Sequence, residues 1–142
     1  MEAESRIRRL VAELTHRTDL GDYDGWVRLF TPDGRMILFG QEHVGHAALR
    51  AFIADDQPPH RRGMHYVTDL LITLGEGDQA GTAGVVSNFL FVAAGSDAPV
   101  VVTGGRYHDR VVEQGGEWLF QERRAELVLP PASRAWGADA AI

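Results

Sequence analysis

The sequence predicts a single α+β domain in which three N-terminal helices pack on one face of a curved, mainly antiparallel sheet. Before Gly63, apolar residues recur at helical spacing, whereas the rest of the chain consists of β-rich runs separated by short turn-like segments. Long consecutive strands with short connections form an antiparallel meander, and helices that precede it can cover one face. The length of 142 residues is the usual size of one domain.

The first helix is expected over residues 3–19, because apolar side chains recur there every three to four positions. Gly21 ends this helix, and Asp22 is in position to cap a short second helix. The apolar residues of the first helix are Ile7, Leu10, Val11 and Leu14, and those of the second are Trp26, Leu29 and Phe30.

A turn signal at Thr31–Gly34 (TPDG) precedes a predicted strand over Arg35–Gly40 (RMILFG). His46–Asp55 predicts a third helix, and the two prolines of Asp56–Gly63 (DQPPHRRG) keep that segment irregular. This loop directly precedes His65 and is therefore the best candidate for a lid. The residues of the third helix that are expected to face inward are Ala48, Leu49 and Phe52.

Four β-rich runs predict the meander, and Gly104-Gly105 within the third run predicts a bulge or sharp bend. The runs are His65–Leu74, Thr82–Ala94, Val100–Glu113 and Glu117–Leu129. Residues 1–130 are expected to form the domain, and residues 131–142 an Ala-rich tail with one large anchor, Trp136.

Both alternating faces of several strands are apolar. In the first run, Val67 and Leu71 share one face, while Tyr66, Leu70 and Ile72 share the other. The helices cover only one face, so we expect a homodimer or larger homo-oligomer formed through the sheet.

Composition excludes several chemistries. All 14 basic residues are arginine and there is no cysteine, so a Schiff-base lysine and a thiolate nucleophile or metal ligand are excluded. The net charge of −6 argues against nucleic acid as a partner. No transmembrane run or secretory signal is present, and a cytoplasmic location is expected. The histidine pairs His43/His46 and His60/His65 match no recognised metal site, so no metal and no cofactor are expected.

Three stretches resemble the SnoaL-like branch of the nuclear transport factor 2-like superfamily. They are Thr18–Thr31 (TDLGDYDGWVRLFT), His65–Ile72 (HYVTDLLI) and Gly105–Arg124 (GRYHDRVVEQGGEWLFQERR). The resemblance implies a cone-shaped fold in which three helices and a strongly bent sheet enclose a pocket. It says less about function, because this superfamily hosts dehydratases, isomerases, cyclases, epoxide hydrolases and binding modules.

Two groups of relatives imply different roles. Scytalone dehydratase and its kin have an acid–base pair, and Asp19 and His65 stand at the matching positions. The second pocket histidine of that enzyme has no clear counterpart here; Asn88 is the nearby polar residue. The small subunits of aromatic ring-hydroxylating dioxygenases, which are mostly structural, share the patterns Ser87-Asn88-Phe89 and Gly105-Arg106-Tyr107-x-Asp109.

The chemistry that follows from the first group is proton transfer. Histidine titrates near pH ~6.5, and a carboxylate on its far nitrogen fixes the tautomer and stabilises the imidazolium. Asp19 lies off the apolar stripe of its helix, which argues against an inward position for it. The alternative to a catalytic role for His65 is a buried structural histidine that is hydrogen-bonded to a carboxylate. The candidate substrate-binding residues are Tyr23, Asn88, Arg106 and Tyr107.

The expected function is therefore cofactor-independent acid–base catalysis on a small molecule. The resemblance implies a dehydratase, isomerase or cyclase acting on a hydroxy-carbonyl substrate, polyketide- or terpenoid-like, in bacterial secondary metabolism. The alternative is a non-catalytic binding or assembly subunit that resembles the small subunit of an oxygenase.

Overall fold

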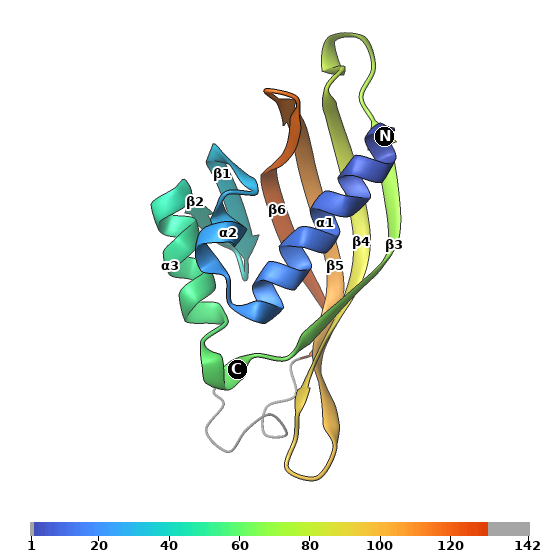
Figure 1. Cartoon of the computed structure of the whole chain (residues 1–142). Helices are drawn as coiled ribbons and strands as arrows, with labels where there is room; N and C mark the ends of the chain where they lie inside the picture. Colours follow the sequence, from blue (N-terminus) through green and yellow to red (C-terminus); the bar gives the residue numbers. More distant parts are fainter. Residues whose placement is uncertain (1, 131–142) are drawn as a thin grey trace.

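The computed structural model describes residues 2–130, which form three helices on one face of a six-stranded sheet (Figure 1). The helices are α1 (Ala3–Leu20), α2 (Tyr23–Val27) and α3 (His46–Asp56). The strands are β1 (Phe30–Leu38), β2 (Gln41–Val44), β3 (Met64–Leu74), β4 (Thr82–Ala94), β5 (Pro99–Gln114) and β6 (Glu117–Leu129). Short 3-10 turns, η1 (Pro59–Arg61) and η2 (Gly77–Gln79), precede β3 and β4. The predicted α+β class is confirmed, while the predicted tail with Trp136 lies outside the described residues.

The signals at the first two helices act as the sequence predicts. Gly21 ends α1 in the left-handed conformation, with φ of 72°, and its N–H donates to the carbonyl of Thr18 at 3.1 Å. The Asp22 carboxylate accepts the N–H of Gly25 at 3.0 Å and so caps α2. Within residues 2–130, no helix is long and apolar enough to cross a membrane.

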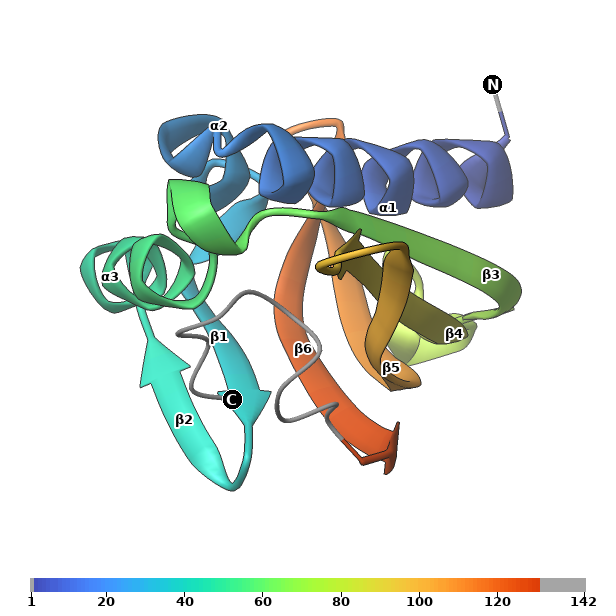
Figure 2. The ribbon, with the colours of Figure 1, turned by 90° about the horizontal axis from the view of Figure 1, so that it is seen from below.

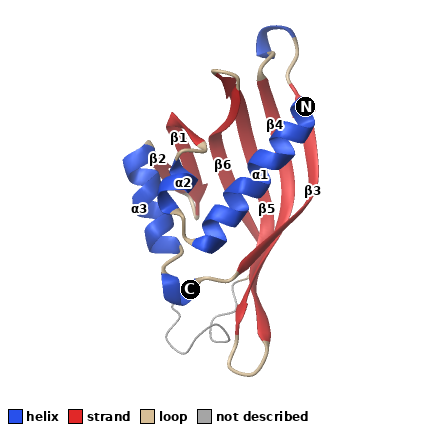
Figure 3. Ribbon diagram, in the orientation of Figure 1, coloured by secondary structure: helices blue, strands red, loops and turns tan. Residues whose placement is uncertain are grey.

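The sheet has the strand order β2-β1-β6-β5-β4-β3, and its strands form a layer separate from the helices (Figure 3). Strands β3 to β6 make the predicted antiparallel meander. Strand β1 pairs parallel to β6, which makes the sheet mixed. The N-terminal part of the chain thus extends the sheet beside its last strand.

The β1–β2 hairpin corrects two expectations. The predicted strand ends at Leu38, because Phe39 and Gly40 both have positive φ, 52° and 73°, and form a two-residue turn into β2. The predicted turn at Thr31–Gly34 lies within β1 instead. The pairing of β1 with β6 shifts register over that segment, so the TPDG sequence interrupts the ladder without reversing the chain.

A bulge in β3 changes which of its side chains face the core. Asp69 has φ of 57°, and the pairing with β4 shifts register between Thr68 and Leu71. Val67, Leu70 and Ile72 therefore all pack against the core, while Leu71 is 68% exposed. The expectation that Val67 and Leu71 share a face was wrong, because the extra residue reverses the alternation.

The main core lies between the helices and the meander. The four apolar residues of the α1 stripe are buried, as predicted. The ring of Phe30 lies between those of Trp26 and Phe120, and its centroid is 4.7 Å from that of Trp26 and 5.4 Å from that of Phe120. The stripe packs in one cluster with Trp26, Phe30, Leu49, Val85, Val111 and Phe120. This packing holds the helices against one face of the sheet.

The sheet bends where the glycine pair predicts it. The pairing of β5 with β6 shifts register between Gly104 and Gly105, and a Cβ at Gly105 would collide with the carbonyl oxygen of Glu126. Viewed along the length of the molecule, β4, β5 and β6 curve beneath the helices (Figure 2). The fold therefore has the predicted cone-like form.

The face of the meander turned away from the helices keeps large apolar side chains exposed. Exposed apolar side chains on this face, here called the outer face, include Tyr66, Leu71, Val86 and Leu90. Arg106, His108 and Glu126 lie among them, with 3.2 Å between His108 Nε2 and the Glu126 carboxylate. The outer face is therefore amphipathic, with charges of both signs.

Candidate active site

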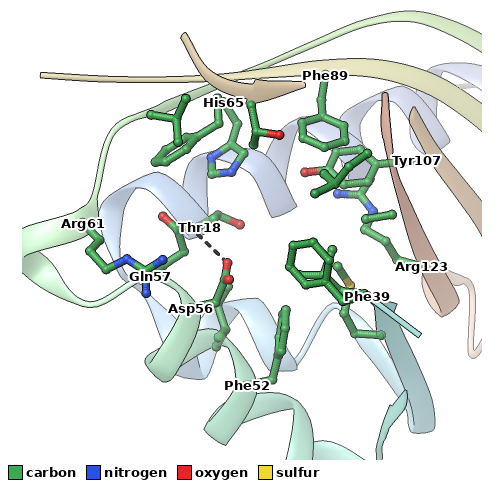
Figure 4. A pocket seen from close by; sticks show the side chains of 18 of the residues that line it. Thr18, Phe39, Phe52, Asp56, Gln57, Arg61, His65, Phe89, Tyr107 and Arg123 are labelled. Atoms are coloured by element: carbon green, nitrogen blue, oxygen red, sulfur yellow. Dashed lines mark hydrogen bonds between the residues drawn. The ribbon is translucent and has the colours of Figure 1, made fainter. Parts of the chain in front are cut away.

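A cavity of about 150 Å³ lies between the helices and the bent sheet (Figure 4). Its walls are mostly apolar, and aromatic rings come from α2, α3, β4 and the β1–β2 turn. These walls include Trp26, Met36, Phe39, Phe52, Phe89 and Leu127. The polar residues in the lining are Thr18, Asp56, Gln57, Arg61, His65, Thr103 and Tyr107, with Arg123 at one side. An apolar cavity with few polar groups is the usual form of a small-molecule site.

His65 lines this cavity and is hydrogen-bonded to Asp19 behind it. The Asp19 carboxylate lies 2.6 Å from Nδ1 of the His65 ring and also accepts the His65 backbone N–H at 3.0 Å. Because a carboxylate only accepts, Nδ1 carries the proton and Nε2 is left for a ligand. The ring also stacks on Phe91, with centroids 4.5 Å apart, so its plane is held on two sides.

Asp19 reaches His65 although it lies off the apolar stripe of α1. The stripe at Leu14 faces the core, whereas the last turn of α1 runs beside the start of β3. The carboxylate accepts the backbone N–H of His65 in that strand, so the path of β3 decides its direction. The side chains of Asp19 and His65 are 17% and 11% exposed, which shields their hydrogen bond from water.

Tyr107 faces the same cavity from β5 (Figure 4). Burial raises the pKa of its hydroxyl to about 12, so the group keeps its proton and can donate a hydrogen bond. Its ring stacks on Phe89 on one side, and the guanidinium of Arg123 lies 3.8 Å from the ring centroid.

Arg123 is itself held by a buried ion pair. Its Nε and Nη2 donate to the two carboxylate oxygens of Asp109 at 2.8 and 2.9 Å. Burial disfavours the guanidinium charge, but the attraction of Asp109 outweighs this and raises the pKa of Arg123. A fixed cation thus supports the ring of Tyr107 on the sheet side of the cavity.

Tyr23 lies outside the cavity. Its hydroxyl donates to the Gln57 carbonyl oxygen at 2.7 Å and accepts from Arg62 at 3.0 Å. The Arg62 guanidinium packs directly over Gly21, where a Cβ would collide with it. Tyr23 therefore ties the loop before β3 to the α1–α2 corner and does not contribute a group to the cavity.

The remaining two candidates, Asn88 and Arg106, lie on the outer face. They are opposite each other on β4 and β5 and line a separate groove with Tyr66 and Leu90. The expectation that they share a pocket with His65 was wrong, because alternation along β4 turns Phe89 inward and Asn88 outward.

Gln57 and Arg123 are among the polar residues of the lining that sequence reasoning missed. Gln57 is in an irregular segment whose packing no periodicity predicts. Asp109 gave a partial signal, because it shares a strand face with Tyr107 and Val111, which predicts a buried carboxylate. Its partner could not be deduced, since a register shift follows Arg110.

The family model of the SnoaL-like domain matches residues 1–124 of the chain. The chain belongs to the SnoaL-like family. A comparison with proteins of curated function found no match.

Solved structures share this SnoaL-like fold. Rv3472 of Mycobacterium tuberculosis, a protein of unknown function, is 30% identical over 86% of this chain and 69% of its own, with a TM-score of 0.78. A Novosphingobium aromaticivorans protein assigned as an aromatic ring hydroxylase is 27% identical over 88% of both chains, with a TM-score of 0.74. A protein of the same organism assigned as a scytalone dehydratase is 18% identical over 93% of this chain and 94% of its own, with a TM-score of 0.74, which shows a common fold.

Proposed function

We propose that this SnoaL-like protein is a cofactor-independent acid–base enzyme, a dehydratase, isomerase or cyclase, acting on a small hydroxy-carbonyl compound. The observation that carries the proposal is the Asp19–His65 hydrogen bond of 2.6 Å at the wall of an apolar cavity. A structural histidine needs no cavity beside it, whereas a general base must reach a ligand. The likeness in fold to a protein assigned as a scytalone dehydratase supports the same class.

The proposed reaction begins with proton abstraction next to a carbonyl group. Nε2 of His65 takes the α-proton, the C–H electron pair forms an enolate, and Asp19 stabilises the imidazolium through Nδ1–H. In a dehydration, the enolate expels the β-hydroxyl group, which takes the proton from Nε2 and leaves as water. In an isomerisation, the same proton returns to a different carbon.

Tyr107 is the proposed donor to the substrate carbonyl oxygen. Its raised pKa keeps the phenol neutral, so it can stabilise the negative charge that develops on the enolate oxygen. The Arg123 cation beneath its ring favours the same charge. Donor and base thus come from different walls, Tyr107 from β5 and His65 from the start of β3.

The apolar lining supports substrates with little polar surface. Aromatic rings such as Phe52 and Phe89 suit a polyketide- or terpenoid-like ring. We extend the proposal to bacterial secondary metabolism in the cytoplasm, where such compounds are built and modified.

Two simple ketones test the chemistry. In D2O, the protein is expected to exchange the α-protons of cyclohexanone for deuterium, and proton NMR measures the rate of this exchange. It is also expected to convert 3-hydroxycyclohexanone to cyclohex-2-enone and water, and the ultraviolet absorbance of the enone measures the rate of this reaction. His65→Gln should slow both reactions by about 10²–10⁴-fold. Asp19→Asn should slow them as well, because the tautomer is no longer fixed.

The matched control is His108→Gln. His108 also contacts a carboxylate, Glu126, at 3.2 Å, but lies on the outer face. Its substitution should leave both rates unchanged. Equal rates for the parent protein and His65→Gln would refute the acid–base proposal.

A second candidate is a non-catalytic binding or assembly subunit. The patterns Ser87-Asn88-Phe89 and Gly105-Arg106-Tyr107-x-Asp109, which resemble those of dioxygenase small subunits, favour it. The chain is also 27% identical to a protein assigned as an aromatic ring hydroxylase. This role predicts that ketones bind in the cavity without exchange. It becomes the better account if neither ketone reacts.

We also propose that the protein forms a homodimer through the outer face. Exposed apolar side chains there, such as Leu71 and Leu90, need a cover. Arg106 and Glu126 place opposite charges on the same face, so two copies related by a two-fold axis can pair each charge with its opposite.

A further inference from the structure

The cavity contains a carboxylate that the proposed proton transfer does not use. Asp56, the last residue of α3, is half-buried and lines the cavity. Figure 4 shows its carboxylate directed into the cavity from the end of this helix. Within residues 2–130, its hydrogen bond comes from a neutral amide, that of Gln57, whose Nε2 donates to Oδ2 at 3.2 Å. No basic side chain of the described residues forms an ion pair with Asp56.

A bound molecule can reach this carboxylate. Its second oxygen, Oδ1, accepts no hydrogen bond within residues 2–130, and it is not among the unpartnered side-chain atoms there that are sealed from solvent. Oδ1 of Asp56 is therefore accessible, whereas the side-chain oxygen of Gln57 is sealed off. An accessible carboxylate oxygen at the wall of a cavity is an acceptor for a donor group of a ligand.

The surroundings of Asp56 favour a positively charged donor. The C-terminal end of a helix carries a partial negative charge, which attracts cations, and the last turn of α3 contains no basic residue. The charge of Asp56 also reaches Tyr107 in the same lining. Burial is the main cause of the raised pKa of Tyr107, and the negative charge of Asp56 adds to it.

A cation at Asp56 would assist the proposed reaction. A negative charge that disfavours a tyrosinate at Tyr107 also disfavours an enolate oxygen that is hydrogen-bonded to this residue. A cationic group bound to Asp56 cancels that charge and forms a charge-assisted hydrogen bond. The empty carboxylate and the enolate are therefore compatible only when the ligand itself supplies the cation.

The lining suits an organic cation better than a metal ion. Phe52, on the same helix as Asp56, and Trp26 both line the cavity, and their ring centroids are 6.4 Å apart. Aromatic rings attract ammonium groups. Hard metal cations instead need several oxygen ligands, and within residues 2–130 no three His, Asp or Glu side chains come together to hold one.

We propose that Asp56 binds an ammonium group of the substrate, while Tyr107 binds its carbonyl oxygen. This inference rests on the proposed function and adds a positive charge to its substrate, which becomes an amino-ketone or amino-aldehyde. An apolar protein cavity of about 150 Å³ is large enough for benzene. The cavity here has the same volume, so the ammonium and carbonyl groups are carried on about one six-membered ring.

Binding of three cyclohexane derivatives tests this inference without turnover. The probes are cyclohexylamine, which is protonated at pH 7, cyclohexanol, which is neutral, and cyclohexanecarboxylate, which is negatively charged. Calorimetry measures their dissociation constants. The parent protein should bind the ammonium compound about 10-fold more tightly than the alcohol, as a hydrogen bond to a charged partner predicts, and the carboxylate most weakly.

The variant Asp56→Asn should remove the ammonium preference. The matched control is Asp55→Asn, which removes the same charge one position earlier, at an exposed residue outside the lining of the cavity. This control should keep the preference. Three outcomes overturn the inference: no ammonium preference in the parent protein, a preference that survives Asp56→Asn, or an equal loss in Asp55→Asn. If Asp56→Asn does not fold, a crystal structure of the parent with cyclohexylamine decides, because the nitrogen must lie within hydrogen-bond distance of the Asp56 carboxylate.

Deuterium exchange separates this inference from the proposed function. In D2O, the parent protein should exchange the α-protons of 4-aminocyclohexanone about 10-fold faster than those of cyclohexanone, after each rate is divided by the uncatalysed rate of the same ketone. Asp56→Asn should remove this advantage. Exchange without any ammonium preference refutes the role of Asp56 alone, and an ammonium preference in binding without exchange of either ketone refutes acid–base catalysis alone.

Discussion

The buried ion pair between Asp109 and Arg123 should be the most sensitive point of the sheet. The two residues are opposite each other on β5 and β6, with side chains 0% and 5% exposed, and they share two hydrogen bonds. Asp109→Val and Arg123→Met each remove one partner and leave the other charge buried. The double variant Asp109→Val/Arg123→Met removes both charges and keeps apolar side chains in their place.

Each single substitution should lower the free energy of unfolding by about 3–5 kcal/mol at neutral pH, because an unpaired charge in the interior is strongly unfavourable. The double variant should lose only about 2 kcal/mol, mainly from the contact of the Arg123 guanidinium with the Tyr107 ring. Burial already raises the pKa of Asp109, and loss of the arginine raises it further. The deficit of Arg123→Met should therefore shrink as the pH falls toward about 4 and the carboxyl is protonated, whereas that of Asp109→Val should not.

Urea unfolding followed by circular dichroism measures these free energies. Arg9→Met is the matched control, since Arg9 pairs with Glu13 on the exposed side of α1 and its loss should cost less than about 0.5 kcal/mol. The reasoning is refuted if the double variant loses as much as the two single variants together. It is also refuted if either single substitution costs as little as Arg9→Met.

Three other substitutions probe separate features. Burial raises the pKa of Tyr107 from the usual 10.0 to about 12, so the free energy of unfolding should fall by up to about 3 kcal/mol as the pH rises from about 10 to about 12. Tyr107→Phe should flatten this part of the pH dependence in urea unfolding. Gly21→Ala should lower the melting temperature more than Gly40→Ala, because both have positive φ, 72° and 73°, but only at Gly21 does a Cβ collide with a neighbouring side chain. Leu90→Asp on the outer face should convert the homodimer to a monomer in light scattering, while Val44→Asp on β2 should not; a monomeric parent protein would contradict the proposed dimer.

Much of the local structure could be predicted because its causes lie close together in the sequence. The α1 stripe follows helical spacing, Gly21 and Asp22 mark the corner between two helices, and the bounds of β4 and β6 agree with the predicted runs to the residue. The hairpin turns of the meander also have local sequence signals, so the antiparallel pairing of its strands could be predicted.

The site was predicted only in part. His65 and Tyr107 line the cavity, and Asp19 is hydrogen-bonded to His65, the pair of residues that the family resemblance implied. Asn88 and Arg106 do not line the cavity, although they are neighbours of cavity residues in the sequence. One position along a strand changes the face on which a side chain lies, so nearness in sequence to Phe89 or Tyr107 places a residue on the opposite face.

The sequence by itself determined the helices, the long strands and the residue types available for proton transfer, because spacing, caps and turns act over a few positions. The tertiary structure alone decided which residues lie opposite each other on neighbouring strands. The bulges at Asp69 and after Arg110 shift register by one residue, which turns Leu71 outward and aligns Asp109 with Arg123. Such shifts depend on packing between segments distant in the sequence, and so does the position of Gln57 at the wall of the cavity.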